Sequence, residues 1–140
     1  MYRSEIFYGK QHFAPCEAIR TAVFIEEQGF HGEFDEIDDR AWHTIVYDGE
    51  KPIATGRAFL NEDGVHTIGR VAALQEYRGK GAGTAVLRAL EEKLRQEGAT
   101  TVCLSAQIQA MGFYRALGYQ PEGAEYLDEH CPHITMKKQL

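Results

Sequence analysis

The chain has few of the features that would assign it to a specialised class of protein. Among its 140 residues there are three cysteines, Cys16, Cys103 and Cys131, and no Cys-x-x-Cys pair. Disulfide frameworks and zinc sites use paired or clustered cysteines, so we expect reduced, structural thiols and no metal site. No apolar stretch approaches the roughly 20 residues that span a bilayer, so no membrane-spanning helix is expected.

Basic residues are in the minority. Lys and Arg number 15 against 21 Asp and Glu, which gives a formal net charge of −6 at pH 7. Binding to nucleic acid needs a basic face, so a nucleic-acid partner is not expected, whereas an acidic protein suits a cationic substrate. Residues Met1–Glu5 also lack the charged head and apolar run of a signal peptide, and we expect a cytoplasmic protein.

The length fits one domain, and no repeat or linker divides it, so we expect a single domain over residues 1–140. Hydrophobic periodicity and turn residues predict strands at 4–8, 42–47, 52–60, 65–74, 100–105 and 133–138. They predict helices at 15–27, between the glycine-rich segment 79–83 and Gly98, and at 108–117. The order β-α-β-β-β-α-β-α-β predicts a layered α/β domain with a mixed central sheet flanked by helices.

A predicted strand leads into a glycine-rich helix start, Arg78-Gly79-Lys80-Gly81-Ala82-Gly83-Thr84. The first helical turn has unpaired N–H groups and the positive end of the helix dipole, and glycine lets a ligand approach the backbone. This segment therefore predicts a phosphate site. It is not a P-loop, which needs Gly-Lys-Ser/Thr, and it is not a dinucleotide fingerprint, because Val86 stands where the third glycine is needed.

The spacing Arg78-x-x-Gly81-x-Gly83 resembles the pyrophosphate loop of the GNAT superfamily of N-acetyltransferases, whose motif is Gln/Arg-x-x-Gly-x-Gly/Ala. Downstream, the run from Phe113 to Tyr119 looks like the Phe-Tyr-x-x-x-Gly-Phe/Tyr element of that family. The segment Arg20–Gln28 and the pair Pro132-His133 are similar to the ElaA/YjcF-like branch. The resemblance covers residues 52–120 well and extends over nearly the whole chain.

The resemblance implies an enzyme that moves an acetyl group from acetyl-CoA to a primary amine by direct attack, through a tetrahedral intermediate. Loop amides would hold the pyrophosphate, the pantetheine arm would pair with the strand before the loop, and an amide near Ala72 could bind the oxyanion. Gln107 lies where the family often has an Asn that contacts CoA. The implied CoA contacts are Val71, Ala72, Ala73, Arg78, Gly79, Lys80, Gly81, Ala82, Gly83, Thr84, Gln107 and Tyr114.

The same resemblance implies that Tyr114 is the general acid, because the leaving thiolate has a pKa of about 8.5 and a nearby phenol can protonate it. The alternative is a packed aromatic residue. The amine, with a pKa of about 10.4, needs a base, and the candidates are Glu27, His43 and His133, of which Glu27 is preferred. Each of the three could instead be a structural or surface group.

The acceptor site is predicted around one face of the first helix. The residues expected to contact the acceptor are Arg20, Phe24, Gln28, His43 and His133. The acidic run from Glu33 to Asp39 could attract a cationic amine, although a solvated loop is the preferred interpretation.

Two other functions stay open at this point. One is an acyl-CoA sensor of the same fold without turnover, and the other is a nucleotide-binding α/β protein of another class. The acceptor is expected to be a small-molecule or peptide amine, and a homodimer is the expected assembly for such an enzyme.

Overall fold

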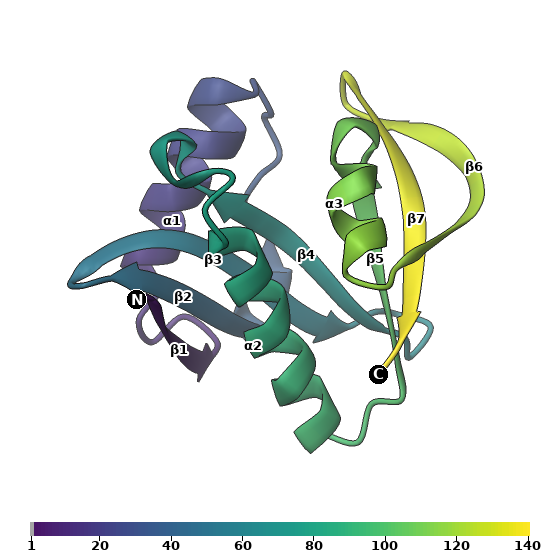
Figure 1. Cartoon of the computed structure of the whole chain (residues 1–140), viewed down its shortest axis with the longest axis horizontal. Helices are drawn as coiled ribbons and strands as arrows, with labels where there is room; N and C mark the ends of the chain where they lie inside the picture. Colours follow the sequence, from purple (N-terminus) through teal and green to yellow (C-terminus); the bar gives the residue numbers. More distant parts are fainter. Residues whose placement is uncertain (1) are drawn as a thin grey trace.

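The chain folds around one seven-stranded sheet, which the computed structural model describes for residues 2–140 (Figure 1). The strands are β1 (Tyr2–Tyr8), β2 (Trp42–Asp48), β3 (Lys51–Leu60), β4 (His66–Ala73), β5 (Thr101–Gln107), β6 (Gln120–Asp128) and β7 (Cys131–Gln139). The helices are α1 (Ala14–Arg20), which continues as the π-helical segment η1 (Thr21–Glu27), α2 (Ala82–Gln96) and α3 (Met111–Ala116), with short 3₁₀ segments η2 (Glu36–Arg40), η3 (Gln75–Tyr77) and η4 (Ile108–Ala110). The predicted layered α/β domain with a mixed sheet is confirmed.

The helices cover both faces of the sheet. Successive residues of a strand point to opposite faces, and on β2 the neighbours Ile45 and Val46 belong to different clusters. Ile45 packs with Phe13 and Cys16 at the start of α1, whereas Val46 packs in the main core, which contains the apolar face of α2. Tyr114 of α3 belongs to that same main core, so α2 and α3 share one face and α1 covers the other.

The sheet is divided between β4 and β5. Its order is β1-β2-β3-β4-β5-β7-β6, and β4 and β5 form the parallel pair in an otherwise antiparallel sheet. Their pairing is confined to Thr67 with Cys103 and Ile68 with Leu104. Beyond it β4 bulges where the register with β3 shifts, and Arg70 there has a φ of 52°. Figure 1 shows β4 turning away from β5 and β7 on this side of the sheet.

Strand β6 was not predicted from the sequence. It pairs with β7 at the edge of the sheet, and eight of its nine residues are exposed, so it lacks the alternation of apolar and polar residues that marks a half-buried strand. The segment 29–41, predicted as a loop, contains the short helix η2. Among residues 2–140, no helix is long and apolar enough to cross a membrane, and the three cysteines are unpaired.

Candidate active site

A cavity of about 340 Å³ opens where β4 and β5 part. Its walls come from η1, the segment that follows it, β3, β4, β5, α3 and β7, and its volume is that of a small-molecule site. The structure brings half of the predicted site residues, nine of eighteen, together here. Those that line the cavity are Phe24, Gln28, Val71, Ala72, Ala73, Arg78, Gln107, Tyr114 and His133.

The glycine-rich loop forms the start of α2, as its composition predicts. Gly81 is the N-cap residue and has a φ of 87°, and Gly79 has a φ of 72°. The helical ladder begins with the bond from the Ala85 amide to the Gly81 carbonyl, so the amides of residues 82–84 lie before the ladder. The segment therefore presents unused N–H groups at the positive end of a 15-residue helix.

Lys80 does not line the cavity. Its side chain lines a separate shallow depression with Asp48 and Glu76, and its amine lies 6.0 Å from the centre of the Tyr77 ring. A contact of Lys80 with CoA would therefore come from its backbone. Gly83, in the first turn of α2, has no room for a side chain, because a Cβ there would stand 3.1 Å from the ring of Phe113.

Tyr114 stands in the wall of the cavity and is 8% exposed. Burial raises the pKa of its hydroxyl to about 12. Its ring packs edge-on against Phe113 and Tyr119, which fixes its direction. A phenol held in this way stays protonated at neutral pH and can donate to an anion inside the cavity.

Two further polar residues of the cavity wall are held by hydrogen bonds. Gln107, at the end of β5, donates from Nε2 to Oε1 of Gln28 at 2.8 Å. His133, at 5% exposure, lies with Nδ1 2.8 Å from the carbonyl oxygen of Cys131. A carbonyl only accepts, so Nδ1 carries a proton, and Nε2 has no hydrogen-bond partner within residues 2–140.

Glu27 does not line the cavity. Both of its carboxylate oxygens accept hydrogen bonds from Arg78, at 2.5 and 2.7 Å, and Arg78 also donates to the carbonyl of Ala73. The hydrogen bonds from Arg78 hold the pKa of Glu27 below its usual value. A carboxylate with a lowered pKa and two occupied oxygens is poorly suited to take a proton.

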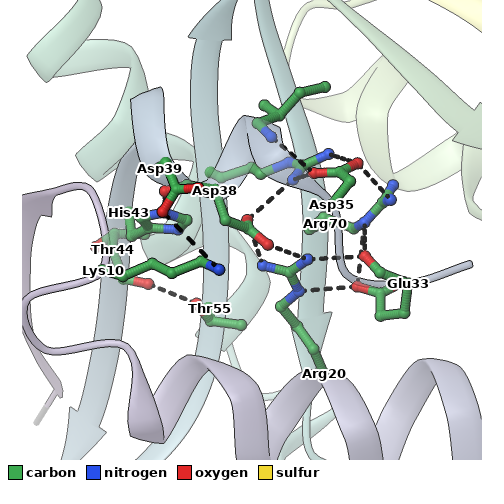
Figure 2. Close-up of polar contacts among 12 residues, drawn as sticks. Lys10, Arg20, Glu33, Asp35, Asp38, Asp39, His43, Thr44, Thr55 and Arg70 are labelled. Carbon is green, nitrogen blue, oxygen red and sulfur yellow. Dashed lines mark hydrogen bonds and ion pairs between the residues drawn. The ribbon is translucent and has the colours of Figure 1, made fainter.

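Arg20 and His43 also lie outside the cavity wall. Arg20 is 1% exposed and donates to Glu33 Oε2 and Asp38 Oδ1, each at 2.8 Å (Figure 2). His43 is enclosed between aromatic rings, with Nε2 3.0 Å from the Asp38 carbonyl, and burial lowers the pKa of His43. We therefore interpret both residues as supports of the site.

The sequence analysis missed the residues that surround Arg20. Arg57 donates to Asp35 and Asp38, at 2.7 and 2.9 Å, and Arg70 lies 3.1 Å from Glu33 and 3.4 Å from Asp35. We call this group, Arg20, Glu33, Asp35, Asp38, Arg57 and Arg70, the buried ion network. It corrects the interpretation of 33–39 as a solvated loop, since three of its carboxylates turn inward to three arginines (Figure 2).

Three members of the network, Glu33, Arg57 and Arg70, also line the cavity. The sequence contained one signal for these residues, the excess of acidic side chains in 33–39. In the folded protein, arginines from other segments lie beside those acidic side chains and pair with them. Among residues 2–140, no group of three or more His, Cys, Asp or Glu side chains is arranged to hold a metal ion.

Comparison with known proteins agrees with this geometry. The model of the acetyltransferase (GNAT) family matches residues 10–119. The uncharacterised N-acetyltransferase YjcF of Bacillus subtilis (strain 168) is 37% identical over 123 residues, which cover 86% of this chain and 87% of YjcF. An acyl-CoA N-acyltransferase from Pseudomonas aeruginosa superposes with a TM-score of 0.83 and 27% identity, over 99% of both chains.

More distant structures share the fold. ElaA of Escherichia coli superposes with a TM-score of 0.85 at 24% identity, over 99% of both chains. A Bacillus anthracis protein solved in complex with acetyl coenzyme A superposes with a TM-score of 0.63 at 16% identity, over 71% of this chain and 62% of its own. From the extent of the family match, this chain belongs to the GNAT family of acetyltransferases and is an acyltransferase.

Proposed function

We propose that the protein transfers an acetyl group from acetyl-CoA to a primary amine, by direct attack through a tetrahedral intermediate. The observation that carries the proposal is the cavity between the parted strands, which has an open edge of β4 on one side and the Tyr114 hydroxyl on the other. The amide-rich start of α2 stands beside it, next to Arg78 in the cavity wall.

Each part of acetyl-CoA has a matching surface. The amides of residues 82–84 suit the pyrophosphate, since they lie before the helical ladder of α2. The edge of β4 beyond Ile68 is not paired with β5, so the backbone at Val71 and Ala73 can pair with the pantetheine arm as a neighbouring strand would. The amide of Ala72 is then a candidate donor to the oxyanion.

Tyr114 is suited to protonate the leaving thiolate. Because burial raises the pKa of the phenol to about 12, the phenol enters the reaction protonated and can donate its hydrogen bond to the thiolate as the C–S bond breaks. We propose that Glu27 holds Arg78 in place, that Gln107 contacts CoA, and that His133 forms the acceptor side of the cavity together with Phe24 and Gln28.

The acceptor class is a primary amine on a small molecule or peptide, in an enzyme that we expect to be cytoplasmic and homodimeric. A bacterial protein of the same fold solved with acetyl coenzyme A supports the choice of donor.

The test is release of thiol from acetyl-CoA with spermidine, glucosamine, alanine amide and Nα-acetyl-lysine amide. Tyr114→Phe should lower kcat by about 100-fold or more, the contribution typical of a general acid, and leave the Kd for acetyl-CoA unchanged. Tyr8→Phe is the matched control, because Tyr8 lies on β1, outside the cavity wall, and is 49% exposed. Tight acetyl-CoA binding with no amine-dependent thiol release would instead indicate a sensor.

A further inference from the structure

Glu33 is a buried carboxylate that the mechanism above does not use. Its side chain is 5% exposed and lies in the cavity wall. Oε2 accepts from Nε of Arg20 at 2.8 Å and lies 3.1 Å from Nε of Arg70. The same two arginines donate to its main-chain oxygen, each at 3.0 Å (Figure 2). Glu33 is therefore fixed from both sides.

The second carboxylate oxygen of Glu33 accepts no hydrogen bond. Within residues 2–140, the hydrogen bond to the Glu33 side chain is made at Oε2, and none is made at Oε1. The single side-chain N or O atom of these residues that is both sealed from solvent and without a hydrogen-bond partner is Nε of Arg57. Oε1 of Glu33 is therefore not sealed from solvent, and Glu33 lines the cavity.

Glu33 lies beside β4, next to the residues that we propose to surround the reacting thioester. Arg70, which Glu33 contacts, directly precedes Val71, which we propose to pair with the pantetheine arm, and Ala72, whose amide is the candidate donor to the oxyanion. Tyr114 lies in the wall of the same cavity. An amine bound at Glu33 would therefore stand near the thioester carbonyl, with the general acid in the same enclosed space.

We propose that Glu33 binds the ammonium group of the acceptor and is the general base that takes its proton. This assignment rests on the proposed function. The ammonium gives one proton to Oε1, and the nitrogen lone pair then forms the C–N bond at the thioester carbon. As the C–S bond breaks, the thiolate takes the proton of Tyr114, and the phenolate takes the second proton from the new amide nitrogen. Glu33 then releases its proton to solvent and is again a carboxylate for the next reaction.

The charges around Glu33 suit this role. It faces Arg20 from α1, Arg57 from β3 and Arg70 from β4, and those arginines also pair with Asp35 and Asp38. Burial raises the pKa of Glu33, and the three arginines offset only part of that rise. A carboxylate with a raised pKa is a stronger base.

The competing candidate is His133. It lines the same cavity, and its Nε2 has no hydrogen-bond partner within residues 2–140, whereas Glu27 has both oxygens occupied and lies outside the cavity wall. A carboxylate also attracts the ammonium that must be deprotonated, which an imidazole ring does not do. The experiment must therefore separate Glu33 from His133.

The test compares Glu33→Gln, Glu33→Asp and His133→Gln with the wild type, using whichever amine of the panel the wild type acetylates fastest. For each variant, kcat/KM is measured against pH, together with the Kd for acetyl-CoA and thermal unfolding. Glu33→Asp keeps the charge of the network but withdraws the free oxygen by one methylene. The matched control is Glu36→Gln, an exposed carboxylate on the same segment that does not line the cavity.

Glu33→Gln should lower kcat/KM by about 100-fold or more at neutral pH with acetyl-CoA affinity unchanged, and should remove the acidic limb of the profile. The difference in kcat/KM between Glu33→Gln and the wild type should become smaller as the pH approaches the pKa of the amine, because more of the amine is then already deprotonated in solution. Glu33→Asp should have a lower kcat/KM than the wild type but keep the acidic limb of the pH profile. Glu36→Gln should match the wild type.

If Glu33→Gln keeps the acidic limb, or if His133→Gln loses it instead, Glu33 is not the general base. Either result would overturn that assignment but not the proposed function. A wild type that acetylates none of the amines would overturn the proposed function as well.

Discussion

Asp38 gives the sharpest test of the buried ion network. Its side chain is 0% exposed, and Oδ1 accepts from both Arg20 and Arg57, at 2.8 and 2.9 Å. Oδ2 accepts a further bond from Arg20 at 3.2 Å. Asp38→Asn keeps the shape but removes the charge and turns one acceptor into a donor that faces a guanidinium group.

The expected cost follows from the charge balance. With Asp38 neutral, three arginines face two carboxylates, so one buried positive charge loses its partner. Breaking a buried ion pair in this way typically costs about 3–5 kcal/mol of unfolding free energy. The neighbouring Asp39 pairs with Lys10 only at 3.9 Å and its side chain is 65% exposed, so Asp39→Asn should change stability by less than about 0.5 kcal/mol.

Urea unfolding followed by circular dichroism, with both variants at neutral pH, measures the difference. Burial raises the pKa of Asp38, but hydrogen bonds and charges of Arg20 and Arg57 outweigh burial and leave the pKa below its usual value. The stability from this lowered pKa is therefore present above the unfolded value of about 3.9 and is lost as pH falls through the folded value. Equal stabilities of Asp38→Asn and Asp39→Asn would refute the reasoning.

Three further predictions concern single groups. Because burial raises the pKa of Tyr114 to about 12, the rate profile should show no alkaline limb from this residue below pH ~11, and an alkaline limb that Tyr114→Phe abolishes near pH ~10 would contradict this. Gly56→Ala would place a Cβ 2.6 Å from Val86 and should lower the free energy of unfolding by about 1–3 kcal/mol, as measured by urea unfolding. Gly112→Ala, in α3 with no atom close to the new Cβ, should instead raise it by up to about 1 kcal/mol. Gly81→Ala should cost about 1–2 kcal/mol because of its φ of 87° and should weaken acetyl-CoA binding in a calorimetric titration.

The fold was predictable where hydrophobic pattern and turn chemistry are local. The long helix between the glycine-rich loop and Gly98 is an example, since Val86, Leu87, Leu90 and Leu94 mark its buried face over the whole length. Strand β6 was not predictable, because it is exposed on both faces and owes its conformation to pairing with β7. The parting of β4 and β5 could not be seen either, since it depends on a bulge at Arg70 that no local pattern marks.

The placement of site residues was predictable where the pattern lies in one short segment, since the glycine-rich loop forms the start of α2 and Tyr114 lines the cavity, while their roles stay predictions. The face assigned to the first helix was partly wrong for a geometric reason. The helix changes from α1 to the π-helical segment η1 after Arg20, and Gln28 donates to the carbonyl five residues back, at Val23, so the α-helical spacing that relates Arg20 to the later residues does not continue into η1. Phe24 and Gln28 reach the cavity, whereas Arg20 turns to Glu33 and Glu27 to Arg78.

The buried ion network links the shape of the sheet to the proposed chemistry. A left-handed conformation at a residue other than glycine is unfavourable, so Arg70 needs compensating contacts to keep its φ of 52°. Its guanidinium finds them at the carbonyl of Glu33 and at the carboxylates of Glu33 and Asp35. The same contacts hold Glu33 in the cavity wall at the point where β4 leaves β5. A change that releases Arg70 should therefore disturb the opening of the sheet and the position of the proposed base together.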